Sequence, residues 1–301
     1  MPYQQEQKPP FMFGPWAKGL TNSVDEYFVP PDGLVTANNV DIDRAGRIEA
    51  RKKWDLLDSA HYKSLFEHNG QTYGVRGSDV GVIEQDNFTS ITTVAGPVDW
   101  TVLDGKLVYT DFSVNKLVNG FTVEDLPTGY YDGDEQERYQ FQSLPAGSAI
   151  RAWNGVLVVA RGRVLYFSEP LWYGVYSAVR GFYRFGEPIR WFEAISYKNT
   201  GGLFVGLTSS VVFLEGTDNT SFKRFTVGLH SAPGVSGILD PRHSGEGTPV
   251  ALWLSDVGVA VGKPDGSVSY PQADRLKDIP LTPGKMSVQD DRVFITTTAE
   301  F

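Results

Sequence analysis

The sequence contains no cysteine, which excludes disulfide bridges, thiolate metal sites and cysteine nucleophiles. Helical patterns are also scarce, because no long stretch places apolar residues at positions i, i+3, i+4 and i+7. No apolar run reaches the roughly 18 residues that a membrane-spanning helix requires, and the longest candidate, Val156–Phe167, is interrupted by Arg161 and Arg163. The N-terminus is polar and rich in proline, without the apolar segment of a secretory signal. We therefore expect neither a membrane-spanning segment nor a signal peptide.

Clustered positive charge is absent as well. The net charge is −9, and the densest basic group, Arg44 to Lys53, is interrupted by Glu49. Proteins that hold nucleic acid through its phosphates need clustered lysine and arginine, so we do not expect sequence-specific DNA binding. An acidic surface is still compatible with one role in contact with DNA. It can line a channel that repels the phosphates and lets the duplex slide.

The residues that are abundant favour short strands and turns. The chain has 32 glycines and 18 prolines among 301 residues, and aromatic residues make up 13%. Glycine and proline favour turns, and aromatic side chains suit strands. Short alternating runs rich in Val, Ile, Phe, Tyr and Thr recur along the chain, for example at Gln71–Val75, Lys106–Thr110 and Arg292–Thr296. The sequence therefore predicts an all-β protein.

These strands come as repeated hairpins. Gly77–Val82 returns almost letter for letter as Leu254–Val259, and in both copies a polar turn stands between two apolar runs. Looser copies place polar turns near positions 112, 162 and 209. The resulting spacing of about 34 to 50 residues is close to that of four-stranded propeller blades. We therefore predict one blade for each of these hairpins.

A second signal lies just upstream of three of these hairpins. Asn69-Gly70, Asp104-Gly105 and Asn154-Gly155 each follow an apolar strand. Asn-Gly and Asp-Gly are the strongest two-residue hairpin signals, because both central residues of the turn need a positive φ. Each repeat is thus predicted to run strand, tight turn, strand, polar turn, strand, and then a longer connection with a fourth strand.

Each end of the chain carries one further hairpin. Asn39–Ala50 contains a turn at Asp43–Gly46, and Lys285–Thr298 contains a turn around Asp290. A propeller must close its ring to hide its sheet edges, and pairing these two hairpins in one blade is the economical closure. We therefore predict an all-β β-propeller of about six blades, closed by pairing of its N- and C-terminal strands.

The predicted fold divides into an extended N-terminal arm over residues 1–36 and a propeller over 37–301, with loop insertions near 127–147 and 170–192. The second insertion is rich in aromatic residues interleaved with arginines. Aromatic residues and arginine are enriched at protein interfaces, although such rings also suit a platform for sugars. We favour a subunit interface formed by Trp172, Tyr173, Tyr176, Phe182, Tyr183, Arg184, Phe185 and Trp191.

Motifs for catalysis, cofactors or metals are scarce. Asp41-x-Asp43-x-x-Gly46 resembles the start of a calcium loop, but Ala45 and Lys52 stand where ligands are expected, so we interpret it as a hairpin turn. The four histidines lack metal-ligand spacing, and no nucleophile elbow, Walker loop or dinucleotide fingerprint is present. We therefore expect no catalytic residue, no cofactor and no metal site, in a protein that is not an enzyme.

The N-terminal segment carries a resemblance to a known family. The matching runs are Lys18–Ser23, Pro30–Gly33, Ala37–Asp43, Gly46–Glu49 and Arg51–Trp54. Together they resemble the opening of the tail nozzle or tail hub proteins (tail tubular protein B-like) of short-tailed bacteriophages, in which a similar hairpin starts a β-propeller. This chain departs from the family pattern at Lys52-Lys53, because Arg51 is often followed by glycine there.

The resemblance implies a structural protein of the virion, assembled in the host cytoplasm and located in the tail. It implies a homo-oligomeric ring, commonly of six subunits, that docks to the adaptor and portal side and to the tail fibres and lines the path of DNA ejection. Contact with DNA would be transient and non-specific, since an acidic lumen does not hold phosphates. Residues 1–20 would reach across a neighbouring subunit, because a polar, proline-rich arm cannot form its own core.

Two other classes of function fit the same fold. A glycan-binding or glycan-cleaving propeller would serve host attachment, and the Ser-Asp-x-Gly turns are similar to structural turns of sialidase propellers. A propeller scaffold of cellular origin would dock peptides. No local spacing selects the arginine, tyrosine and carboxylate residues that a glycosidase of that kind needs, so the tail protein is the favoured hypothesis.

Overall fold

The structure is a computed structural model, and it describes residues 19–20, 33–34, 40–42, 48–50, 61–84, 87–129, 134, 138–242, 244, 247–289 and 292–297. Within these residues the strands form five four-stranded and four two-stranded sheets. The prediction of an all-β protein is confirmed. In this part of the chain no helix has the length and apolar character needed to cross a membrane.

The five four-stranded sheets are antiparallel, and we call them blades 1 to 5. Blade 1 contains β5 (Tyr62–His68), β6 (Gln71–Arg76), β7 (Asp79–Glu84) and β8 (Asn87–Thr93). Blade 2 contains β9 (Asp99–Leu103), β10 (Lys106–Thr110), β11 (Asn115–Asn119) and β12 (Thr122–Asp125). Blade 3 contains β14 (Ala149–Trp153), β15 (Val156–Arg161), β16 (Val164–Phe167) and β18 (Phe182–Arg184). Blade 4 contains β19 (Ile189–Tyr197), β20 (Thr200–Leu207), β21 (Ser210–Glu215) and β22 (Lys223–Leu229). Blade 5 contains β23 (Ser236–Leu239), β24 (Val250–Ser255), β25 (Gly258–Gly262) and β26 (Val268–Ser269).

The remaining strands form short pairs. In the N-terminal part β1 (Gly19–Leu20) runs parallel to β2 (Gly33–Leu34), and β3 (Val40–Ile42) is antiparallel to β4 (Ile48–Ala50). Beside blade 3, β13 (Phe141–Ser143) pairs with β17 (Val175–Ser177). After blade 5, β27 (Gly284–Gln289) pairs with β28 (Arg292–Thr297).

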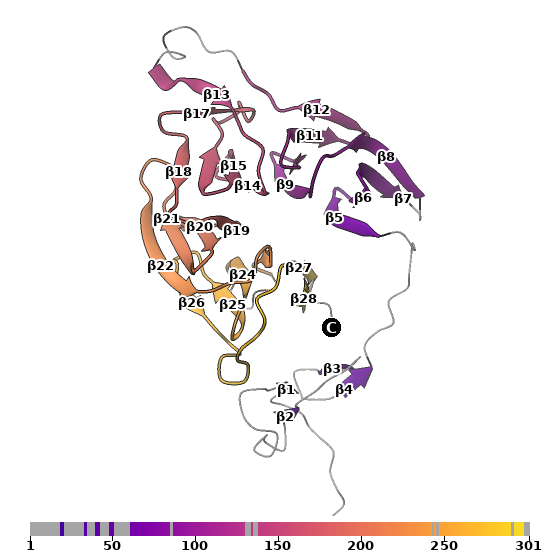
Figure 1. The fold of residues 1–301 in the computed structure, drawn as a ribbon, viewed down its shortest axis with the longest axis vertical. Helices are drawn as coiled ribbons and strands as arrows, with labels where there is room; N and C mark the ends of the chain where they lie inside the picture. Colours follow the sequence, from indigo (N-terminus) through magenta and orange to yellow (C-terminus); the bar gives the residue numbers. More distant parts are fainter. Residues whose placement is uncertain are drawn as a thin grey trace, which may run out of the picture.

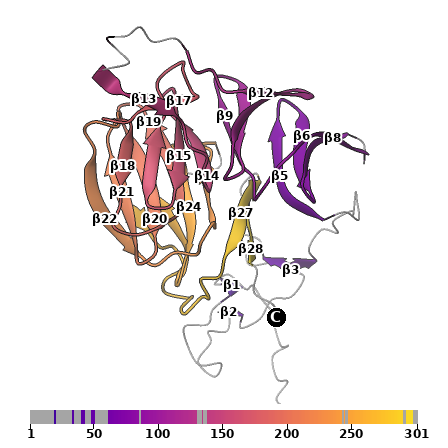
Figure 2. The same ribbon diagram turned by 45° about the horizontal axis from the view of Figure 1, so that its top comes forward.

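The blades follow one another around a common centre in chain order, from the violet blade 1 to the orange blade 5 (Figure 1). The first strand of each blade faces that centre. These inner strands contact one another in sequence, because β5 lies against β9, β9 against β14, β14 against β19, and β19 against β23. The hairpin β27–β28 continues the series, since β27 contacts β23, and a view turned by 45° shows it beside the blades (Figure 2). This is the arrangement of a β-propeller.

The apolar core lies between the blades, not within any of them. Separate clusters of buried side chains fill the junctions of blades 1 and 2, 2 and 3, 3 and 4, and 4 and 5. A fifth cluster joins blade 5 to the C-terminal hairpin through Leu254, Met286 and Ile295. A sheet this small buries its faces only against its neighbours. The central strands are covered on both sides, and for this reason Leu157–Ala160 on β15 is buried at four successive positions.

The three tight turns have the predicted geometry. The φ angles are 52° and 74° at Asn69-Gly70, 50° and 72° at Asp104-Gly105, and 47° and 79° at Asn154-Gly155. Each turn joins the first two strands of its blade in a two-residue loop, as the register of β14 and β15 illustrates with Trp153 opposite Val156. The prediction of these turns from their asparagine, aspartate and glycine residues is confirmed.

The same turns also connect neighbouring blades. The ring nitrogen Nε2 of His68 forms a hydrogen bond of 3.0 Å with the carbonyl of Gly105, from blade 1 to blade 2. The Nδ2 of Asn154 donates to the carbonyl of Thr217 at 3.0 Å, from blade 3 to blade 4. A tight turn therefore holds its own hairpin and fixes the position of the next sheet.

All five predicted polar turns join the second and third strands of a blade, which confirms the repeat. The two most similar copies of the repeat, however, place the turn at different positions of their shared sequence motif. In blade 1 the turn is Gly77-Ser78, with Arg76 paired to Asp79. In blade 5 the turn is Asp256-Val257, with Ser255 paired to Gly258. The two copies therefore form equivalent hairpins, but the turn residues occupy different positions of the motif.

The segment near 170–192 differs from the expected loop. It contains β17, the outer strand β18 of blade 3, and the beginning of the inner strand β19 of blade 4. The predicted long connection is thus largely strand, because blade 3 needs a fourth strand and takes it from this segment. The insertion near 127–147 contributes β13, which pairs with β17, although residues 130–133 and 135–137 lie outside the described residues.

The two terminal hairpins are present where the sequence predicts them. Val40 lies opposite Ala50 in β3–β4, and Gln289 lies opposite Arg292 in β27–β28. They form two separate two-stranded sheets, so neither their pairing in one blade nor a count of six blades is confirmed. Most of the predicted arm over 1–36 lies outside the described residues.

The tight turns generate a stability prediction. Gly155 has a φ of +79° and open space around its Cα, so a methyl group at that position would strain the backbone without touching a neighbour. We expect Gly155→Ala to lower the free energy of unfolding by about 1–2 kcal/mol, because the left-handed conformation is costly for residues with a Cβ. The measurement is the denaturant midpoint.

The matched control for this prediction is Gly186→Ala. Gly186 also has open space, and its φ lies outside the left-handed region. We expect this variant to be as stable as the parent protein or slightly more stable. Equal destabilisation by the two substitutions would contradict the assigned role of the turn.

Candidate functional site

The inner strands of blades 2 to 5 carry a polar cluster that bridges neighbouring blades. Its members are Asp99 on β9, Arg151 on β14, Glu193 on β19 and Ser236 on β23. We call these four residues the inner-strand cluster. The strands that carry them are otherwise largely apolar, and the side chains on either side of Arg151 include the fully buried Ile150. The cluster is therefore a polar group set where four sheets converge.

Arg151 is the centre of this cluster. Its Nε and Nη2 donate to the two carboxylate oxygens of Glu193 at 2.8 and 2.9 Å. Its Nη1 donates to Asp99 Oδ2 at 2.6 Å and to the carbonyl of Ile150 at 2.7 Å. The hydroxyl of Ser236 then donates to Glu193 Oε1 at 2.8 Å. One guanidinium thus links three blades, and the serine extends the connection to a fourth.

The electrostatics of the cluster follow from its burial. Glu193 is 2% exposed, while Arg151 and Asp99 are 23% and 19% exposed. Burial by itself would lower the pKa of Arg151, but the charges of Asp99 and Glu193 and their hydrogen bonds raise it above its ordinary value. Arg151 therefore stays charged at every accessible pH, and the bidentate pairing with Glu193 is the strong, directional kind.

The hydrogen bonds indicate what this cluster can do chemically. Both oxygens of Glu193 already accept hydrogen bonds, and most of the guanidinium donors of Arg151 are used within the cluster. Such an arrangement is suited to holding the four inner strands in fixed positions relative to one another. It is less suited to proton transfer. Among the described residues no group of three or more His, Asp or Glu side chains could hold a metal ion.

The sequence reasoning did not single out these four residues. The available signal was a charge inside an otherwise apolar first strand, seen at Asp99, Arg151 and Glu193. It could have been found by comparing the first strands of successive repeats. Only the structure shows that these three charged residues contact one another, because their strands belong to neighbouring blades.

The structure divides the predicted subunit interface into buried and exposed members. Trp191, Phe185 and Tyr173 are buried within the chain. The indole of Trp191 donates to the Ser231 hydroxyl at 2.9 Å and packs at 5.5 Å between ring centroids against Trp253. These rings belong to the packing between blades, and they have no surface left for another subunit.

The other members of the predicted interface retain exposed surface. Trp172 and Phe182 are 38% and 42% exposed, and Arg184 is also exposed. Tyr176 and Tyr183 are half-buried. An interface role stays a prediction for these residues. Aromatic density in a sequence does not separate rings that fill a core from rings that face solvent, because both sets occur in one short segment.

Tyr173 has a specific role inside the chain. Its hydroxyl donates to the carboxylate of Asp104 in the tight turn of blade 2, which ties the segment after blade 3's third strand to that turn. Burial, together with the hydrogen bond and the charge of Asp104, raises the pKa of Tyr173 to about 12. The phenol therefore stays protonated over the whole physiological range.

The inner-strand cluster generates a stability prediction. Glu193→Gln keeps the shape of the side chain but removes the charge that pairs with Arg151. We expect a loss of about 2–4 kcal/mol in the free energy of unfolding, because Arg151 is left in a largely buried site with an incomplete partner set. The measurement is chemical denaturation at neutral pH.

The matched control is Asp125→Asn. Asp125 accepts a 2.6 Å hydrogen bond from Lys116, but its side chain is 88% exposed. Removal of a charge from such a surface pair is expected to cost at most about 1 kcal/mol. A Glu193→Gln effect no larger than that of the control would show that the cluster does not hold the blades together.

Tyr173 generates a prediction about pH. Its pKa is about 12 in the folded chain and near 10 when exposed, so its contribution to stability is complete below pH 10 and is lost as the pH rises from 10 to 12. We expect Tyr173→Phe to be less stable than the parent by about 1–2 kcal/mol at pH 7 to 9. Above pH 10 the difference between the two proteins should shrink. A difference that stays constant up to pH 12 would contradict this role.

Comparisons with known proteins give similarity at the level of solved structures. Neither a protein-family model nor a curated protein sequence matches the chain. A gluconolactonase from Xanthomonas campestris is 12% identical, with a TM-score of 0.48 over 75% of this chain and 79% of that one. The Pan2 WD40 domain from Neurospora crassa is 11% identical, with a TM-score of 0.44 over 76% and 69%. An extracellular domain assigned to a two-component system of B. thetaiotaomicron is 9% identical with a TM-score of 0.49, and the match covers 78% of this chain but only 31% of that one. The first of these proteins is an enzyme, and the expectation that the present chain is not one stays a prediction.

Proposed function

We propose that this chain is a structural subunit of a bacteriophage tail, which forms a nozzle or hub ring along the path of DNA ejection. The observation that carries the proposal is the N-terminal motif and its hairpin. Within the region of the motif, Val40–Ile42 and Ile48–Ala50 pair as β3–β4, with Ile42 opposite Ile48. This is the place at which the resemblance to tail nozzle proteins puts the hairpin that starts the propeller.

The mechanical character of the inner strands supports this proposal. A conduit has to keep its shape while DNA passes, and the inner-strand cluster holds the inner strands of four blades through charge-assisted hydrogen bonds. The net charge of −9 also favours release of a polyanion, because few positive charges are available to retain phosphates. Passage of DNA would then be transient and independent of sequence.

The same proposal includes a sixth blade. β27 contacts β23 as every inner strand contacts its neighbour, and Met286 and Ile295 pack onto the cluster beside blade 5. The hairpin β27–β28 would supply the inner half of this blade, and β3–β4 would supply the rest. Such a blade would place strands from the N-terminal and C-terminal parts of the chain in one sheet and remove the open edges of the ring.

The surface beside blade 3 supplies the proposed contact between subunits. Leu171, Val179 and Phe182 are 71%, 60% and 42% exposed, and Trp172 and Arg184 lie in the same segment. Exposed apolar residues with aromatic and arginine neighbours are typical of interfaces. The ring would be a homo-oligomer, with six subunits as the expected number, and its two faces would dock to the adaptor and portal side and to the tail fibres.

The oligomeric state tests the proposal. We expect the full chain to run as a ring in light scattering coupled to size exclusion, and to show a central pore wide enough for duplex DNA in electron micrographs. Phe182→Glu should dissociate the ring, because it places a charge in the proposed contact. A monomer at micromolar concentration at every salt concentration would overturn the proposal.

Phe121→Glu is the matched control for this experiment. Phe121 is 48% exposed, similar to Phe182, but it lies at the β11–β12 turn of blade 2. The ring should survive this substitution. Dissociation by both variants would assign the effect to general surface charge and not to the proposed contact.

A further inference from the structure

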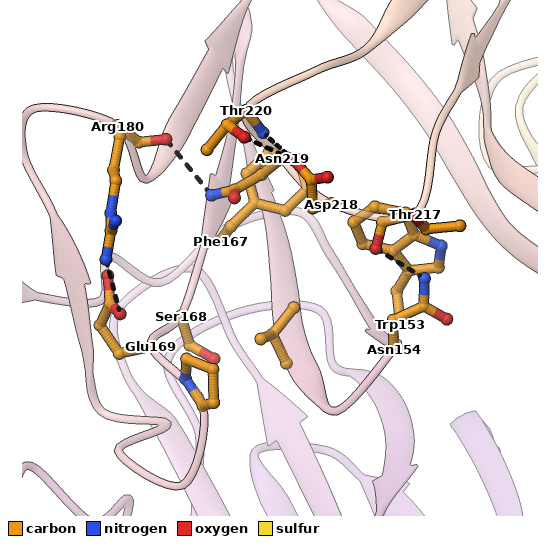
Figure 3. Close-up of a pocket in the computed structure, with 12 residues that line it drawn as sticks. Trp153, Asn154, Phe167, Ser168, Glu169, Arg180, Thr217, Asp218, Asn219 and Thr220 are labelled. Carbon is orange, nitrogen blue, oxygen red and sulfur yellow. Dashed lines mark hydrogen bonds and ion pairs between the residues drawn. The ribbon is translucent and has the colours of Figure 1, made fainter.

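A cavity of about 310 Å³ lies between blades 3 and 4, outside the inner-strand cluster. It is bounded by the tight turn after β14, by the segment that follows β16, and by the connection between β21 and β22 (Figure 3). Its volume is at the lower end of the range for small-molecule sites. The tail role proposed above makes no use of it.

The floor of the cavity is apolar and firmly packed. Trp153 and Phe167 are 4% and 1% exposed, and Val156 lies beside them. Trp153 stacks on Phe222 at 5.4 Å between ring centroids, and Phe167 lies 5.6 Å from the same ring. These aromatic contacts hold the floor in place before any ligand arrives.

The rim of the cavity is polar, and hydrogen bonds between the blades fix it. Asn154 donates to the carbonyl of Thr217 at 3.0 Å, and Asn219 donates to the carbonyl of Arg180 at 3.2 Å. The Asp218 carboxylate accepts from the Thr220 amide at 2.8 Å and from its hydroxyl at 2.6 Å. A rim that is ordered in advance lowers the entropic cost of binding.

The charges of the rim select the class of ligand. Glu169 and Asp218 are acidic, and Arg180 lies 3.8 Å from Glu169 and 4.2 Å from the centre of the Tyr139 ring. Two carboxylates disfavour an anion. A cation is also disfavoured, because Glu169 already lies beside Arg180 and Asp218 already accepts hydrogen bonds from Thr220. The site therefore suits a neutral molecule that both donates and accepts hydrogen bonds and also has an apolar face.

We propose that this cavity binds a neutral mono- or disaccharide. The apolar face of the sugar ring would lie on the floor of the cavity, and its hydroxyl groups would donate to the carboxylates and accept from the amides of the rim. This proposal is independent of the tail role, because the two are tested separately. A ring that does not bind sugars would contradict only the sugar site, and a monomer that binds a sugar would contradict only the tail role.

The hydrogen bonds of Asp218 set its role in this site. Cleavage of a glycosidic bond needs one carboxylic acid that is protonated near neutral pH, usually with a raised pKa. The hydrogen bonds that Thr220 and Ser221 donate to Asp218 lower the pKa of that carboxyl instead. Asp218 is thus a permanent acceptor and not a proton donor.

The test is saturation-transfer difference NMR on the full chain. The probes are glucose, galactose, mannose, N-acetylglucosamine, lactose, maltose and cellobiose at millimolar concentration. We expect at least one of them to bind with a Kd on the order of 1 mM. The absence of a signal from all seven would overturn the proposal.

Variants locate the binding. Glu169→Gln is expected to weaken the affinity about tenfold, because a hydrogen bond to a charged acceptor is lost. Val156→Phe fills the cavity without changing its polar groups and should abolish binding, while circular dichroism checks that the fold is kept. Glu124→Gln, an exposed carboxylate on β12 of blade 2, is the matched control and should leave the affinity unchanged. Equal affinity in all three variants would overturn the assignment to this cavity.

Discussion

Apolar packing between adjacent blades is the interaction on which the rest of this structure depends. Each sheet has short strands and two faces, and no sheet can bury both of them by itself. The buried clusters accordingly lie at the junctions between sheets, and blades 2 to 5 each contribute to the cluster on either side. Stability is therefore shared between neighbours, as in other repeat architectures, and removal of blade 2, 3 or 4 would expose faces of both its neighbours.

Polar contacts refine the positions that this packing permits. Arg151 joins Asp99 and Glu193 where the inner strands converge, and the tight turns add contacts such as His68 with Gly105. Apolar surfaces can slide past one another, whereas charge-assisted hydrogen bonds have a defined direction. We expect the inner-strand cluster to set the rotation of one blade relative to the next, at a cost in desolvation that the apolar clusters offset.

Blade 3 and its junction with blade 4 carry several of the features on which the proposed functions depend. A rigid centre suits a conduit, while the outer part of the junction between blades 3 and 4 leaves a cavity between Trp153 and the loop at Asp218. The exposed apolar residues Leu171, Val179 and Phe182 come from the same segment of the chain as Pro170 and Arg180, which line this cavity. Blade 3 thus contributes to the inner-strand cluster, the proposed subunit contact and the proposed sugar site, and the last two are neighbours, because Pro170 and Arg180 of the cavity are adjacent in the chain to Leu171 and Val179 of the contact.

The sequence by itself determined the local structure. Asn154-Gly155 and its two counterparts specify their turns because asparagine, aspartate and glycine tolerate a positive φ, and the terminal hairpins were predicted for similar local reasons. Only the tertiary structure decided which side chains meet. Trp191 is a core residue and Trp172 is exposed within one aromatic segment, and Arg151 lies 42 residues before Glu193 in the chain. Such outcomes depend on how the blades stack, and a pattern of period two along one strand carries no information about the neighbouring sheet.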